Sequence, residues 1–225
     1  SGLCSMKGRN PIRPPVMDDG QELAVKEVFP TLQGEGPYAG WPAIFIRLGG
    51  CNLACDFCDT AFEDFDTLSL ADLIARVKAL AHPACRLAVI TGGEPLRQNV
   101  APLCVALQQT GYHVQIETNG TLYRELPEGV ELVCSPKNTG TGYHAIRPDL
   151  IPMIRAFKFI VSAKHPLYQG IGDVGQGLYH TPVYIQPMDE GNAAQNAENI
   201  QHATSLALAN GYRLSLQLHK IVGIA

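Results

Sequence analysis

Three cysteines within eight residues are the strongest candidates for chemistry in this chain, in the pattern Cys51-Asn-Leu-Ala-Cys55-Asp-Phe-Cys58. Thiolates are soft ligands that suit iron–sulfur clusters or zinc. Three of them leave one iron of a four-iron cube open to a small ligand, whereas a structural zinc takes four protein ligands. The next candidates, His82 and Cys85, lie beyond a predicted helix. The spacing therefore favours an open 4Fe–4S cluster, with zinc and unliganded core cysteines as alternatives.

Short apolar runs that alternate with helical patterns predict the elements that must position these cysteines. Strands are predicted over residues 25–29, 43–48, 87–91, 114–117, 131–134, 157–161, 183–186 and 214–218. Helices are predicted over residues 70–80, 99–110 and 193–210, with Ser69 as an N-cap and Gly111 and Gly211 as stops. This alternation predicts βαβ units and a mostly parallel sheet. About six repeats predict an α/β fold of the partial (β/α)6 barrel type, because eight need a longer chain.

Polar segments follow five of the predicted strands at their carboxyl ends. In a barrel of parallel strands these ends lie on one face, where active sites are built. Each segment alone is a weak turn signal, but together they predict one catalytic mouth. The segments are the cysteine motif, Gly92-Gly93-Glu94-Pro95, Thr118-Asn119-Gly120, Ser135-Pro136-Lys137 and Pro187-Met188-Asp189.

Composition narrows the class of protein. The chain has 225 residues, of which 46% are hydrophobic and 17% charged, as in an ordinary globular domain. The net charge of −4, without a long basic run, argues against nucleic acid or an anionic membrane as the main partner. No apolar stretch approaches the roughly 18 residues that cross a bilayer. Seven cysteines with three clustered indicate the reducing cytoplasm and not a secreted disulfide scaffold.

The chain is predicted to have a disordered leader followed by one domain. Residues 1–24 are rich in Pro, Gly and charge and form the predicted leader, of which residues 1–5 resemble an expression scar. The domain covers residues 25–225. Two glycine-bearing stretches, residues 138–147 and 168–179, are long for connections and are candidates for lids or contact loops. The remaining cysteines of the domain lie in apolar patterns and are predicted as core residues, namely Cys85, Cys104 and Cys134.

The motifs resemble a known superfamily. The cysteine pattern after the first barrel strand, with Gly92-Gly93-Glu94-Pro95 after the next, resembles the radical S-adenosylmethionine (SAM) superfamily. A narrower resemblance, to the 7-carboxy-7-deazaguanine synthase family, rests on the short chain and four further features. These are Leu32-Gln33-Gly34-Glu35-Gly36, Arg47 shortly before Gly49-Gly50-Cys51, Cys58-Asp59-Thr60, and the ending Gln217-Leu-His219-Lys220.

The resemblance implies a carbon–nitrogen lyase that converts 6-carboxy-5,6,7,8-tetrahydropterin to 7-carboxy-7-deazaguanine with loss of ammonia. This reaction belongs to the biosynthesis of queuosine and other 7-deazapurines. The resemblance also implies a 4Fe–4S cluster, SAM and Mg²⁺ as cofactors, a flavodoxin-like one-electron reductase and a homodimer. An activating enzyme for a glycyl-radical partner, a non-enzymatic electron-transfer protein and a zinc-stabilised binding module are the alternatives. The first leaves the loop around Gln33 without a small ligand, and the second leaves the segment around Glu94 unexplained.

The resemblance assigns roles to individual positions. The cluster ligands are Cys51, Cys55 and Cys58, and the Mg²⁺ ligand is Thr60. The SAM contacts are Phe57, Cys58, Asp59, Gly93, Ser135, Pro136, Lys137, Gln186, Pro187, Met188 and Asp189, with Glu117 and Asn119 near the ribose. The substrate contacts are Leu32, Gln33, Gly34, Glu35, Arg47, Thr91, His219 and the terminal carboxylate of Ala225, where members of the family often have Pro.

Simpler interpretations stand beside four of these roles. An arginine fork suits a carboxylate, but Arg47 could instead pair with an internal Asp or Glu. Mg²⁺ takes oxygen ligands, but Thr60 could instead cap a helix. The loop of Gln33 to Glu35 could be a plain turn, and a lone residue such as His219 is often structural.

Overall fold

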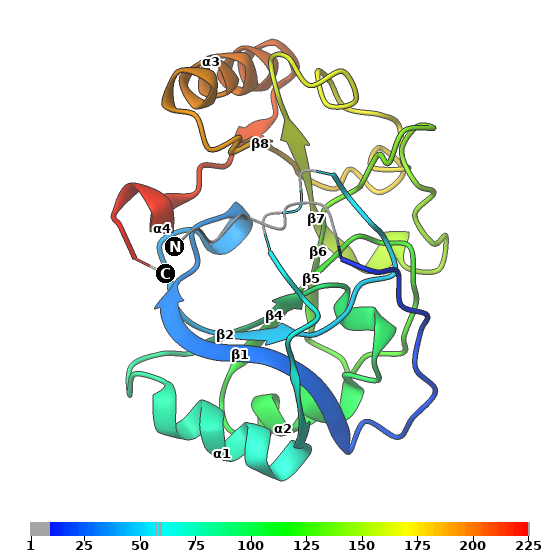
Figure 1. The fold of residues 1–225 in the computed structure, drawn as a ribbon, viewed down its shortest axis with the longest axis vertical. Coiled ribbons are helices and arrows are strands. Elements are labelled where there is room, and N and C mark those ends of the chain that lie inside the picture. The colour runs from blue at the N-terminus through cyan, green and yellow to red at the C-terminus, as the bar shows by residue number, and fades with distance from the viewer. Residues whose placement is uncertain (1–9, 57, 59, 225) are drawn as a thin grey trace.

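The computed structural model describes residues 10–56, 58 and 60–224, and it contains one nine-stranded sheet in the order β3-β1-β2-β4-β5-β6-β7-β8-β9. The strands β2 and β4 to β9 pair in parallel with one another, and β1 is antiparallel to both β2 and β3. The sheet curves around the centre of the molecule without closing, with β3 and β9 as its edges (Figure 1). The prediction of a partial (β/α) barrel is therefore confirmed. The strands are β1 (Glu22–Leu32), β2 (Pro42–Leu48), β3 (Asp66–Ser69), β4 (Leu87–Gly92), β5 (His113–Thr118), β6 (Glu131–Cys134), β7 (Ile154–Val161), β8 (Val183–Pro187) and β9 (Arg213–Leu214).

Three longer helices lie on the outside of this sheet. Asp72 N donates to the Ser69 side chain at 3.1 Å, which confirms the predicted N-cap of α1. Gly211 ends α3 with a φ of 70°, a left-handed conformation that glycine adopts without strain. The helices are α1 (Leu70–Leu80), α2 (Ala101–Gln109), α3 (Ala193–Asn210) and the single turn α4 (Leu218–Ile221), with short 3₁₀ turns at Gly36–Tyr38, Pro95–Arg97 and Ile151–Met153.

The alternation of strands and helices is less regular than predicted. In the part of the chain that the structure describes, no α-helix lies in the connections β5–β6, β6–β7 and β7–β8. The glycine-bearing stretches 138–147 and 168–179 belong to the last two of these connections. The predicted strand 214–218 is also wrong, because Ser215 ends the pairing after β9 and Leu218 already begins α4. There the Ser215 hydroxyl accepts from Gly36 N at 2.9 Å, so the chain turns towards the loop after β1.

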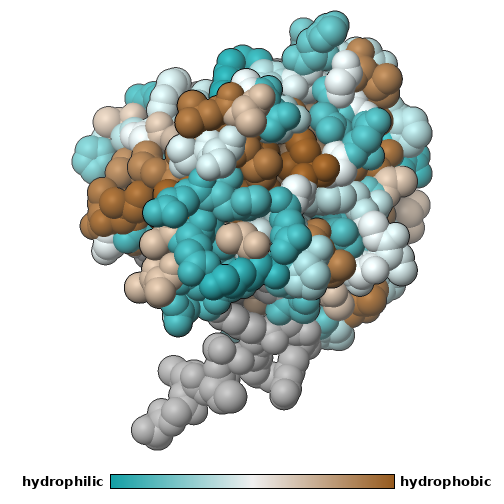
Figure 2. All heavy atoms as spheres, turned by 90° about the horizontal axis from the view of Figure 1, so that it is seen from above, coloured by the Kyte–Doolittle hydropathy of each residue, from teal (hydrophilic) through white to brown (hydrophobic). Residues whose placement is uncertain are grey.

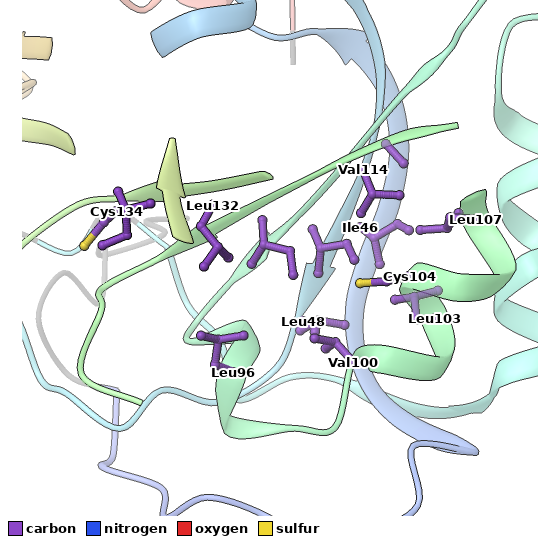
Figure 3. Close-up of a cluster of buried hydrophobic side chains, with 14 of the residues drawn as sticks. Ile46, Leu48, Leu96, Val100, Leu103, Cys104, Leu107, Val114, Leu132 and Cys134 are labelled. Carbon is purple, nitrogen blue, oxygen red and sulfur yellow. The ribbon is translucent and has the colours of Figure 1, made fainter. Parts of the chain in front are cut away.

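The largest core cluster fills the space between the sheet and the helices α1 and α2 (Figure 3). Ile46 and Leu48 of β2 face Leu103 and Leu107 of α2 across this layer, and all four are fully buried. The predicted core cysteines are 3% exposed or less, which confirms the interpretation of Cys85, Cys104 and Cys134. Burial of this apolar surface stabilises the barrel wall against which the loops are built.

The N-terminal segment differs from the predicted disorder up to residue 24. Strand β1 already begins at Glu22, and the residues before it contact the rest of the protein. Ile12 forms a parallel bridge with Cys51, and Arg13 N donates to Cys51 O at 2.8 Å. Hydrogen bonds to polar backbone groups thus order residues 10–24 although few of their side chains are apolar. Residues 1–9 lie outside the described part.

Candidate active site

A cavity of about 290 Å³ opens at the carboxyl ends of the parallel strands. All five polar segments that follow strands contribute to its lining, through residues such as Cys51, Gly93, Asn119, Lys137 and Met188. Since these residues come from distant parts of the chain, the predicted convergence on one mouth holds. The cavity has a size suited to small molecules.

The three clustered cysteines all line this cavity and are partly buried. Burial raises the pKa of the Cys51 thiol to about 12 and also raises that of Cys55, so deprotonation requires compensating positive charge. Among the described residues, no three His, Cys, Asp or Glu side chains gather closely enough to hold one metal ion. Three thiolates on one cavity can each bind one iron of a 4Fe–4S cluster and leave the fourth iron without a protein ligand.

Glu94 holds together the loops that surround the cysteines. Its buried carboxylate accepts hydrogen bonds from Thr118 Oγ1 at 2.7 Å, Asn119 N at 2.7 Å and Leu96 N at 3.0 Å. Its own N–H donates to Gly50 O at 3.1 Å. Burial raises the pKa of Glu94, and the three hydrogen bonds oppose that rise. Glu94 thus ties the ends of β4 and β5 together through its carboxylate, and the end of β2 to them through its backbone N–H.

Gly93 allows two loops to pass each other closely. A Cβ at this position would lie 1.9 Å from Gly50 O, so a larger residue would push the cysteine loop away. Gly93 N donates to Leu48 O at 3.1 Å, which fixes the backbone where it borders the cavity. A bare backbone of this kind permits close approach of a cofactor.

An ionic cluster occupies another part of the cavity wall. Lys158 of β7 is 4% exposed, and its ammonium pairs with Glu35 and, at 3.3 Å, with Glu117. Burial raises the pKa of Glu35, but the charge and hydrogen bond of Lys158 and a hydrogen bond from Gln217 outweigh this and lower the pKa to about 2. Burial lowers the pKa of Lys158, but the two carboxylates raise it above its usual range. Glu35 and Lys158 are therefore both ionised near neutral pH.

Two glutamine side chains complete this ionic cluster. Gln33 Nε2 donates to Glu117 Oε1 at 3.2 Å, and Gln217 Nε2 donates to Glu35 Oε1 at 2.9 Å. Gln33 is buried and is more than part of a turn, since its Oε1 also accepts from Glu35 N at 3.1 Å. The carboxylates are thus held at fixed orientations.

The turn α4 packs directly onto the loop after β1 (Figure 1). Leu218 N donates to Gly34 O at 3.1 Å, and a Cβ on Gly34 would lie 2.0 Å from His219 Nδ1. Burial lowers the pKa of His219, and Glu35 partly offsets this. His219 therefore lines the cavity as a neutral ring near pH 7.

Arg47 lies in the cavity wall and also forms the ion pair that was the simpler interpretation. Its Nε contacts Glu27 Oε1 at 2.7 Å, and its guanidinium lies 5.7 Å from the Phe29 ring centroid. The pair is partly open to solvent, because the Glu27 side chain is 47% exposed. The guanidinium can therefore exchange this partner for a ligand carboxylate at modest cost.

Thr60 and Thr91 also line the cavity. No helix begins at Thr60 in the described part of the chain, which excludes the N-cap interpretation. Instead its carbonyl accepts from Asn10 Nδ2 at 2.8 Å. Thr60 therefore lines the cavity beside the cysteines in irregular backbone.

The segments after β6 and β8 supply further polar groups to the cavity. Lys137 Nζ donates to Ser135 Oγ at 2.6 Å, and burial lowers the pKa of Lys137. Asp189 Oδ2 lies 2.6 Å from Lys220 Nζ, and this hydrogen bond holds the pKa of Asp189 below its usual range. Gln186, Pro187 and Met188 also line the cavity.

Some predicted site residues fall elsewhere, and sequence reasoning missed others. Leu32, Gly34 and Pro136 do not line the cavity, although each neighbours a residue that does, and Phe57, Asp59 and Ala225 lie outside the described residues. Lys158 was missed, although a lysine inside the apolar run of β7 was a usable signal. Asn10 was missed because it lies in the predicted leader.

Among the described residues, no helix is long and apolar enough to cross a membrane. The face seen from above carries hydrophilic residues interspersed with hydrophobic ones (Figure 2).

Comparisons with known proteins all point to radical SAM enzymes of one kind. The radical SAM superfamily profile matches residues 45–148. A Rickettsia prowazekii protein named 7-carboxy-7-deazaguanine synthase is 51% identical over 224 residues, which cover 97% of this chain and 96% of the relative. A Rhodospirillum rubrum protein of the same name is 43% identical over 98% of this chain and 100% of its own length. The crystal structure of QueE from Escherichia coli matches with a TM-score of 0.68 and 26% identity, over 87% of this chain and 94% of that one.

Proposed function

Because the chain belongs to the 7-carboxy-7-deazaguanine synthase family of radical SAM enzymes, we propose that its cavity converts 6-carboxy-5,6,7,8-tetrahydropterin to 7-carboxy-7-deazaguanine for queuosine biosynthesis. The observation that carries the proposal is the cavity itself, which is lined both by three thiols and by the ionic cluster of Glu35, Glu117 and Lys158. An activating enzyme for a glycyl-radical partner would instead need a groove for a polypeptide loop.

Cys51, Cys55 and Cys58 would hold the 4Fe–4S cluster as thiolates, since all three line one cavity and lie within eight residues of the chain. When bound, the cluster and SAM supply the radical that removes hydrogen from the substrate. The bare backbone of Gly93 and the polar groups of Ser135 and Lys137 would hold SAM beside the open iron. Gln186 and the residues that follow it would border SAM on the opposite side.

The ionic cluster suits the ring end of the substrate. A pterin presents N–H donors along one edge, and the carboxylates of Glu35 and Glu117 are acceptors that Lys158 orients. Gln33 adds an amide that both donates and accepts. Positioning of this kind selects which hydrogen the radical reaches.

The opposite end of the substrate carries a carboxylate, for which Arg47 is the matching group. The Thr60 hydroxyl would bind Mg²⁺ together with substrate oxygens and water, since Mg²⁺ often keeps several waters when the protein supplies few ligands. Thr91 and His219 would contact the substrate between these ends.

We further propose the cytoplasm, a flavodoxin-like reductase and a homodimer as the setting of the reaction. No disulfide joins any of the six described cysteines, as expected for a reducing compartment. The reductase follows from the need of the cluster for single electrons from outside the chain.

Reconstitution tests the proposed function directly. Anaerobically reduced protein with SAM, Mg²⁺ and the carboxytetrahydropterin should yield 7-carboxy-7-deazaguanine by mass spectrometry. Cys55→Ala should lose iron and product, whereas Cys104→Ala, which removes a thiol from the core, should keep its iron. A colourless, zinc-loaded protein contradicts the cluster, and SAM cleavage without deazaguanine contradicts the substrate.

A further inference from the structure

The N-terminal residues 10–16 lie along the cysteine loop (dark blue in Figure 1) and are called the strap here. The parallel bridge of Ile12 with Cys51 and the hydrogen bond of Arg13 N to Cys51 O join the strap to the first cysteine. At the other end of the motif, the strap reaches Cys58 through Asn10. The strap therefore spans the cluster motif from its first ligand to its last.

Asn10 is oriented so that its amide faces sulfur. Its Oδ1 accepts from Phe62 N at 2.9 Å, which directs the NH₂ group towards the cysteine loop. One N–H of that group donates to Thr60 O at 2.8 Å, and Nδ2 lies 3.7 Å from Cys58 Sγ, within hydrogen-bond reach of a sulfur acceptor. Because the side chain has both an acceptor and a two-proton donor, these three contacts use it fully.

The strap is anchored independently of the cysteines. Arg13 pairs with Glu63, with Nε 2.8 Å from Oε2. Buried Arg97 donates to Pro14 O at 3.2 Å and receives a hydrogen bond from Val16 N at 2.8 Å. Contacts outside the cysteine loop thus also hold the strap in place.

We propose that Asn10 is a positioning residue for the cluster, which donates a hydrogen bond to the Cys58 thiolate and raises the reduction potential of the cluster. The proposal rests on the proposed function, since it assumes the 4Fe–4S group. A hydrogen bond to a ligand sulfur favours the reduced state, which carries more negative charge, and such contacts are among the levers that set cluster potentials. The strap therefore contributes to the ease with which the cluster accepts an electron.

A redox titration of the reconstituted full chain, followed by electron paramagnetic resonance, tests this proposal. Asn10→Leu should lower the ratio of reduced to oxidised cluster at a fixed potential by about three- to tenfold, a shift of ~28–59 mV for one electron. Asn10→Asp keeps the acceptor for Phe62 N but loses the donor, so its potential should fall at least as far. Asn99→Leu is the matched control, because Asn99 Nδ2 holds Asp18 O near the strap and has no contact with a cysteine. Its potential should equal that of the wild type.

The outcomes separate the two proposals. If wild-type protein takes up no 4Fe–4S cluster, the proposed function fails and the role of Asn10 fails with it. If all proteins hold full iron and Asn10→Asp keeps the wild-type potential, the role of Asn10 alone is refuted. If Asn10→Leu loses iron, the reduction potential of Asn10→Asp decides whether Asn10 has the redox role, since aspartate has the shape of asparagine and preserves the loop. Should Asn10→Asp lose iron as well, Asn10 is a structural anchor and the redox role is refuted.

Discussion

Lys158 lies between two carboxylates, so Lys158→Met removes the ammonium that Glu35 and Glu117 share. The three side chains are 4%, 15% and 18% exposed, so water compensates little for the lost charge. Breaking a buried pair from one side costs about 3–5 kcal/mol. For a chain of this length, each kcal/mol shifts the melting temperature by about 2–4 °C, so we expect a fall of roughly 6–20 °C at pH 7.

The pH dependence gives the prediction its signature. In the wild type the pKa of Glu35 is lowered to about 2, so its stabilising contribution is present above the ordinary value of about 4.3 and lost as the pH falls through 2. In Lys158→Met, burial dominates and raises the pKa of Glu35. Protonation then relieves the buried charge, and the gap between variant and wild type should narrow from pH 7 to pH 5.

Thermal unfolding followed by circular dichroism at both pH values provides the assay. Lys164→Met is the matched control, because the pair of Lys164 with Glu198 spans 2.6 Å but is 62% and 47% exposed, and should cost at most about 1 kcal/mol. Adding Glu35→Gln to Lys158→Met should recover part of the loss, since a neutral amide needs no cation. Equal losses for both lysine variants, or a gap independent of pH, would refute the buried ionic cluster.

Three further predictions follow from single contacts. Gly93→Ala places a Cβ 1.9 Å from a backbone oxygen of the cysteine loop, so its affinity for SAM, measured by equilibrium dialysis, should fall. Gly177→Ala is the control and should match the wild type, because open space surrounds Gly177. Arg47→Ala should weaken substrate binding by about 10- to 100-fold, because a charged hydrogen bond of ~1.5–3 kcal/mol is lost. The affinity for SAM should change little, and equal losses of affinity for both ligands would contradict the role of Arg47. Ser69→Ala should lose about 1 kcal/mol in urea unfolding, and an unchanged midpoint would count against the N-cap.

The barrel strands could be predicted because strands that are buried on both faces form short apolar runs in the sequence. Strand β6 coincides with its predicted range, and β4 extends its range by one residue, since both are continuous apolar runs that end at polar loops. The convergence of those loops follows from parallel pairing alone. The family resemblance then supplied roles that spacing could not.

The missed features depend on contacts between distant residues. Residues 214–218 carry an apolar pattern, but Ser215 and Leu218 bond to the loop after β1, and this contact overrides local preference. Asn10 lies in a polar segment whose order comes from backbone partners such as those near Cys51 and Thr60. Neither partner is visible from composition or periodicity.

The hydrogen bonds of Glu94 have a consequence for the affinity of the site. Because this carboxylate already receives donors from Leu96, Thr118 and Asn119, the loops after β4 and β5 are held together when the chain folds. A cofactor that enters the cavity then meets a preorganised wall and loses less conformational entropy in ordering it. More of the binding free energy of the cofactor can therefore act to orient the reacting atoms.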